Sequence, residues 1–135
     1  MGNLNLILFI SFAAPLTYNA TIKAGDLVYK DMSTLYQDEN KLYKIKMTGK
    51  EIVDYLECSY DRWVQDPQAN GGHVLRIINQ ADVWSGNAQW RFAYVPYNLD
   101  SAAGLCYTVD VTRPYGERVT VSSLADGTPF DASAE

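Results

Sequence analysis

The chain has 135 residues and an apolar fraction of 47%, which suits one globular domain with a sizeable core and excludes a disordered chain. Its net charge is −5 and it contains no run of Lys or Arg, which argues against a nucleic-acid phosphate track or an anionic membrane surface as partner. The 10 Tyr and 3 Trp suit a strand-rich core and rim, with stacking on a base or sugar as the alternative.

The stretch from Leu4 to Ala14 (LNLILFISFAA) is the most apolar of the chain. We predict a buried strand that ends at Pro15, because the run is too short to span a bilayer as a helix. The alternative is the apolar region of a signal peptide, but Met1-Gly2-Asn3 carries none of the positive charge that precedes one. Whether Met1 is a gene start or a cut in a longer chain stays open.

A turn is predicted at 24–26 (AGD) from its glycine and aspartate. Asp31 is then expected to cap a short helix that carries Met32, Leu35 and Tyr36. Residues 37–41 (QDENK) form a polar loop. This loop leads into the clearest pattern of the sequence.

Residues 41–63 change period from strand to helix. Tyr43, Ile45 and Met47 alternate with lysines, which predicts a strand with one buried face. After Thr48 and Glu51, which form a capping-box pattern, apolar residues recur at helical spacing through Ile52, Leu56, Tyr60 and Trp63.

The second half of the chain is predicted to be an antiparallel meander. Residues 65–72 have loop composition, and 65–89 as a whole looks like a variable insertion with a short strand at 74–78 and a turn at 84–87. Strands are predicted at 90–97, at 105–111 and from Val119, with a loop at 98–104 and a two-residue hairpin turn at Asp126-Gly127, in which both residues would have positive φ.

No nucleophile elbow, phosphate loop, zinc-protease or dinucleotide motif is present. The acidic residues of the 37–41 loop and of the helix are expected to be solvated rather than catalytic: Asp38, Glu39, Asp54, Glu57 and Asp61. The lone His73 lacks an orienting partner nearby, so we expect a surface histidine. Cys58 and Cys106 are expected to be two buried thiols, with a disulfide between them as the alternative.

Five segments of the sequence resemble the C-terminal domain of the bacterial 5′-nucleotidase and 2′,3′-cyclic-nucleotide 2′-phosphodiesterase family. In the family's order they are SFAAPL (11–16), AGD (24–26), LYQDENKLYKIKMTGKEIVDYLE (35–57), YNLDSAAGLCYTVDVTRP (97–114) and RVTVSSLADGTPFD (118–131). The resemblance covers most of the chain and is weakest in the 65–89 insertion. It implies that residues 1–135 are a single α+β domain, layered α/β/β/α and incomplete at the C-terminus.

The resemblance also implies what such a domain does. It would supply the nucleoside pocket of an exported bacterial enzyme, in the periplasm or at the cell surface, and would not be catalytic by itself. Hydrolysis would belong to an absent N-terminal metallophosphatase domain, where two divalent metal ions activate water. No cofactor, metal ligand, nucleic-acid partner or membrane span is expected in this chain.

The family's binding residues carry over in part. Asn40 matches a family asparagine, but the base-stacking aromatic two positions earlier falls on Asp38, which cannot stack. The family's second aromatic lies beyond residue 135. An arginine found in some relatives falls near Asn19, a weaker phosphate partner. Tyr18 and Tyr36 are the candidate substitutes for the missing aromatic.

Two functions follow from these matches. The first is a nucleoside-recognition domain of a nucleotide hydrolase. The second is a surface interaction or structural module that kept the fold and lost nucleotide binding, which the Asp38 substitution favours. An incomplete domain would also leave strand edges open, so we expect self-association.

Overall fold

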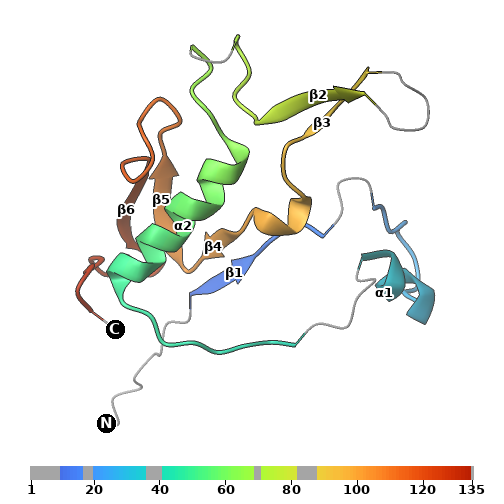
Figure 1. The fold of residues 1–135 in the computed structure, drawn as a ribbon. Coiled ribbons are helices and arrows are strands. Elements are labelled where there is room, and N and C mark those ends of the chain that lie inside the picture. The colour runs from blue at the N-terminus through green and yellow to red at the C-terminus, as the bar shows by residue number, and fades with distance from the viewer. Residues whose placement is uncertain (1–9, 17–19, 36–40, 69–70, 82–87, 135) are drawn as a thin grey trace, which may run out of the picture.

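The computed structural model describes residues 10–16, 20–35, 41–68, 71–81 and 88–134. Within these residues the chain forms two α-helices, one 3₁₀ turn and six short strands (Figure 1). In chain order they are β1 (Ser11–Ala13), α1 (Tyr29–Leu35), α2 (Gly49–Trp63), β2 (Ile77–Ala81), β3 (Ala88–Phe92), η1 (Pro96–Asn98), β4 (Ser101–Ala103), β5 (Leu105–Val109) and β6 (Val119–Leu124).

Helix α2 is the central element, and its start confirms the predicted capping box. The Thr48 amide donates to Glu51 Oε2 (2.7 Å), and the Glu51 amide donates to Thr48 Oγ1 (3.3 Å). Two orphan amides of the first turn are therefore satisfied by side chains. The predicted apolar stripe is confirmed as well, because Ile52, Leu56 and Trp63 are buried.

The core lies between α2 and the hairpin made by β5 and β6 (Figure 1). Its buried members are Ile52 and Leu56 from the helix, Leu105 from β5 and Val119 from β6. Ring and aliphatic side chains of neighbouring segments cover these four. Among them are Ile10, Phe12, Met47, Tyr107 and Phe130.

The described strands form three separate antiparallel pairs, β1–β4, β2–β3 and β5–β6, where we predicted one continuous meander. The difference arises at residues 101–103, which we placed in a loop. They form β4 and pair with the N-terminal strand β1, with Ser11 opposite Ala103. Gly104 (φ 91°) then allows a sharp turn into β5. The mixed helix and sheet content agrees with the predicted α+β class.

The strand predicted through Tyr43, Ile45 and Met47 is not formed. Residues 41–48 have no regular secondary structure, and Tyr43 and Ile45 are 77% and 68% exposed. Alternation yields a strand only where a neighbouring strand completes the hydrogen-bond ladder, and no described strand pairs with this segment. Met47 alone packs against the core.

Helix α1 forms where predicted, but Asp31 caps it differently. Asp31 lies in the first turn of the helix, and its Oδ2 accepts from the Val28 amide (2.9 Å). The side chain thus reaches back to the residue before the helix instead of occupying the N-cap position itself. None of the seven residues of α1 is buried.

Several predicted strand ends shift. The N-terminal strand is seen only at Ser11–Ala13, since 1–9 lie outside the described residues. The strand predicted at 90–97 ends at Phe92, before Pro96 starts η1. Strand β2 begins at Ile77, not Val74, although Leu75 still forms an isolated bridge with Val64. The turn predicted at 84–87 lies outside the described residues.

Two turns that end strands also differ from prediction. Strand β5 ends at Val109 because Asp110 opens a turn, accepting from the Thr112 amide (3.0 Å). In the Asp126-Gly127 turn only Gly127 has positive φ (87°), and the Leu124 amide donates to Thr128 O (2.9 Å). That geometry closes a three-residue loop with glycine at its left-handed position, not a two-residue turn.

Candidate functional site

The five residues proposed to bind substrate all lie outside the described residues. They are Tyr18, Asn19, Tyr36, Asp38 and Asn40. Their assignment as binding residues therefore stays a prediction. Three of the five lie between helices α1 and α2. There the described chain ends at Leu35, the last residue of α1, and resumes at Lys41, which leads into α2 (Figure 1).

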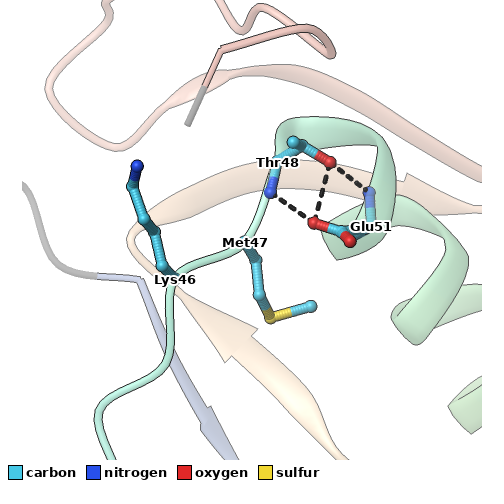
Figure 2. Close-up of a pocket in the computed structure, with 4 residues that line it drawn as sticks. All are labelled: Lys46, Met47, Thr48 and Glu51. Atoms are coloured by element: carbon cyan, nitrogen blue, oxygen red, sulfur yellow. Dashed lines mark hydrogen bonds between the residues drawn. The ribbon is translucent and has the colours of Figure 1, made fainter.

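A shallow hollow of about 210 Å³ lies at the start of α2, lined by Lys46, Met47, Thr48 and Glu51 (Figure 2). The Glu51 carboxylate there already accepts from the Thr48 amide and from Thr48 Oγ1 (3.0 Å). The bond from the Thr48 amide is the main reason that the pKa of Glu51 is lowered from 4.5. Lys46 extends away from this carboxylate (Figure 2). The acid that lines this hollow, Glu51, is therefore already engaged in capping helix α2.

Glu57 is buried, which corrects its prediction as a solvated acid. Its side chain is 2% exposed, and its two carboxylate oxygens accept from the amides of Gly116 (3.0 Å) and Val119 (2.6 Å). Gly116 lies in the β5–β6 connection, and Val119 is the first residue of β6. A buried carboxylate is retained where hydrogen bonds replace its water, so Glu57 fastens this connection to α2.

Asp61 is partly exposed and is engaged in two ion pairs. Its Oδ1 accepts from Arg118 Nη1 (2.8 Å) and from Arg76 Nη2 (3.0 Å). Arg118, which is buried, donates its Nε to Arg113 O (2.9 Å). Asp61 therefore ties both hairpins to α2. The partners lie 15 and 57 residues away in sequence, and no local pattern signals such a pairing.

A third contact holds the segment before β4 against α2. Ser59 Oγ accepts from the Asp100 amide (2.7 Å) and donates to Asp100 O (2.9 Å). The Tyr55 hydroxyl donates to Asp100 Oδ2 (2.5 Å). Partial burial, followed by this bond to Asp100, raises the pKa of Tyr55 to about 12.

Tyr60 and Tyr107 join α2 to β5 through their hydroxyls, which are 3.0 Å apart. Either hydroxyl can donate the bond between the two tyrosines. The Ala102 amide also donates to Tyr107 Oη (3.2 Å), which links β4 to the pair. Burial, with this hydroxyl contact second, raises the pKa of Tyr60. The Tyr60 phenol therefore stays protonated at neutral pH, and the hydroxyl contact ties α2 to β5.

His73 is exposed, as predicted, with its ring centroid 5.8 Å from that of Trp90. The prediction for the cysteines is wrong, since Cys58 and Cys106 are both free and both exposed. Cys58 lies off the buried stripe of α2. Cys106 follows the buried Leu105 in β5, so the alternation of the strand turns it outward.

Two negative results concern the described residues alone. No group of three or more His, Cys, Asp or Glu among them is arranged to hold a metal ion. No helix in the described part of the chain is long and apolar enough to cross a membrane.

Comparison with known proteins gives a family match over nearly the whole chain. Residues 8–135 match the family model described as "5'-nucleotidase, C-terminal domain". No solved structure matches significantly.

Curated relatives agree with this family match. The chain is 37% identical over 97 residues to "Trifunctional nucleotide phosphoesterase protein YfkN" of Bacillus subtilis, covering 72% of the chain and 6% of that protein. It is 32% identical over 94 residues to "2',3'-cyclic-nucleotide 2'-phosphodiesterase/3'-nucleotidase" of Salmonella typhimurium, covering 69% and 12%. It is 31% identical over 94 residues to "5'-nucleotidase" of Vibrio parahaemolyticus, covering 62% and 17%. The chain thus spans a small part of each relative.

Proposed function

The chain belongs to the 5'-nucleotidase C-terminal domain family, and on that premise we propose that it is the nucleoside-recognition domain of a nucleotide phosphoesterase. The family match over residues 8–135 is the observation that carries the proposal. The relatives support it, because their names describe enzymes that act on nucleotides or cyclic nucleotides. Asn40 and its neighbours Asp38 and Tyr36 would contact the ligand, together with Tyr18 and Asn19.

Hydrolysis is assigned to another part of the parent protein. The described residues hold no cluster fit for a metal ion, and two acids of α2, Glu57 and Asp61, bind backbone amides and arginines. Divalent metals would therefore act in an N-terminal metallophosphatase domain, where they polarise the phosphoester and activate water. We place the parent protein outside the cytoplasm of a bacterium, in nucleotide breakdown, and assign the domain the family's α/β/β/α layering.

The second candidate is an interaction module without nucleotide binding. Asp38 favours it, since a carboxylate stands where the resemblance expects the base-stacking ring. A carboxylate offers no π-face to a base. It also repels a phosphate of like charge.

Calorimetric titration of the 135-residue chain with a panel of nucleosides and nucleotides tests the two candidates. The recognition function predicts saturable binding that Asn40→Ala weakens and that Asn79→Ala, an exposed asparagine of β2, leaves unchanged. It also predicts no phosphate release from any panel member when divalent metal is added. Absence of binding across the panel would replace it with the interaction module.

A further inference from the structure

Residues 41–47 (KLYKIKM) have the alternation of a strand, but no described strand lies beside them. They run as an extended stretch to the start of α2 (Figure 1). Leu42 is fully exposed, and Tyr43 and Ile45 are mostly exposed. Single exposed apolar side chains are common, but three within four residues mark a surface that another molecule can cover.

The backbone of this stretch has unused hydrogen-bonding groups at two alternate residues. Neither Tyr43 nor Ile45 makes a hydrogen bond to any described residue. In an antiparallel pair, alternate residues exchange both their N–H and C=O bonds with the same neighbour, so these two residues would face one incoming strand. Met47 packs against the core and Thr48 caps α2, which anchors the stretch at its C-terminal end. A stretch anchored in this way loses less freedom when a partner orders it.

The charge of the stretch decides which kind of strand fits beside it. Lys41, Lys44 and Lys46 are exposed, and residues 41–47 contain no acid, although the whole chain has a net charge of −5. Pairing with the same stretch of a second copy would place lysines beside lysines. Like charges on paired strands destabilise a sheet, and lysines on a strand edge work against self-pairing in this way. A strand that carries carboxylates has the complementary charge.

We propose that residues 41–47 bind an extended peptide segment of a partner protein in which apolar and acidic residues alternate. The peptide adds as a strand and bonds the backbone of Tyr43 and Ile45. Its apolar side chains cover these two residues, and its carboxylates pair with Lys44 and Lys46. The inference goes beyond the proposed function, because its ligand is a peptide and not a nucleotide.

A fluorescein-labelled heptapeptide, Glu-Val-Glu-Val-Glu-Val-Glu, titrated with the 135-residue chain and followed by fluorescence anisotropy, tests the proposal. The matched peptide Lys-Val-Lys-Val-Lys-Val-Lys keeps the apolar residues and reverses the charge. Both titrations use about 0.15 M salt, which screens the charge of the rest of the chain. We expect saturable binding of the acidic peptide and roughly tenfold weaker binding of the basic one, because repulsion replaces the cross-strand ion pairs.

Variants of the stretch separate strand addition from a general effect of charge. Ile45→Pro should weaken binding of the acidic peptide at least roughly tenfold, because proline has no N–H to donate. The double variant Lys44→Glu, Lys46→Glu should prefer the basic peptide. Lys23→Glu with Lys30→Glu is the matched control, because it changes the net charge equally at two exposed lysines outside the stretch. It should keep the preference for the acidic peptide.

Each outcome supports or overturns the proposal. Binding of neither peptide, or of both equally, overturns it. If Ile45→Pro binds the acidic peptide like the parent chain, or if the control double variant loses the preference, strand addition at 41–47 is wrong. If no peptide binds and Ile45→Pro abolishes self-association in sedimentation velocity, a second copy covers the stretch instead. Circular dichroism checks that each variant is folded, and nucleoside binding, measured separately, is unaffected by any of these results.

Discussion

Replacing Glu57 with glutamine should destabilise the fold strongly, although the change removes no carbon atom. The two oxygens of Glu57 accept from the amides of Gly116 and Val119 in a buried position. A glutamine keeps one acceptor oxygen and turns an NH₂ group toward the other amide. One bond loses its charge assistance, and one buried N–H loses its acceptor.

These two losses set the size of the effect. A hydrogen bond to a charged group contributes about 1.5–3 kcal/mol, and an unsatisfied buried donor costs about 1–3 kcal/mol. We therefore expect Glu57→Gln to lower the free energy of unfolding by about 2–4 kcal/mol, a large share of the roughly 5–15 kcal/mol typical of a domain. Urea unfolding followed by tryptophan fluorescence measures the change.

A control with the same chemistry is available in the same connection. Glu117 is exposed and pairs loosely with Arg113 at 3.7 Å, so Glu117→Gln should change the free energy of unfolding by less than about 0.5 kcal/mol. If Glu57→Gln were as mild as Glu117→Gln, the buried carboxylate would not hold the β5–β6 connection. The reasoning from its two amide contacts would then be refuted.

Two further predictions concern the helix cap and the strand edges. Because the folded pKa of Glu51 is lowered below 4.5, its stabilising effect is present above pH 4.5 and is lost as the pH falls through the folded pKa. The stability advantage of the parent chain over Glu51→Gln should therefore shrink on acidification in urea unfolding; an advantage independent of pH would contradict the cap. We also propose that the chain self-associates, since each described sheet has only two strands and hence open edges. Sedimentation velocity should show a concentration-dependent rise in mass, and a monomer at every concentration would exclude it.

Local patterns predicted the parts of the fold that local interactions determine. Thr48 and Glu51 lie three residues apart, so a single turn of helix brings them together and the capping box could be predicted. The apolar spacing from Ile52 to Trp63 likewise specified one buried face. Strands β5 and β6 followed from alternation combined with turn residues.

The errors arose where the deciding partner is distant in sequence. Residues 101–103 form a strand only because β1 lies beside them, about 90 residues earlier in register. Tyr43 and Ile45 alternate correctly but lack a described neighbour, so alternation alone did not make a strand. Glu57 has the composition of a solvated helix residue, and only the approach of the β5–β6 connection buries it. For the site, the residues that the resemblance supplied lie outside the described residues, so their assignment stays a prediction.

Helix α2 is the common support of the other described elements of the core. Its N-terminal cap fixes Thr48, where the segment that begins at Lys41 reaches the core. About two and three turns later, Tyr55 and Ser59 hold Asp100 and with it the segment before β4. Glu57 and Asp61 then hold the two hairpins to the same helix. A substitution that loosens α2 would therefore release the segment before β4 and both hairpins together, because all three are held by side chains of this one helix.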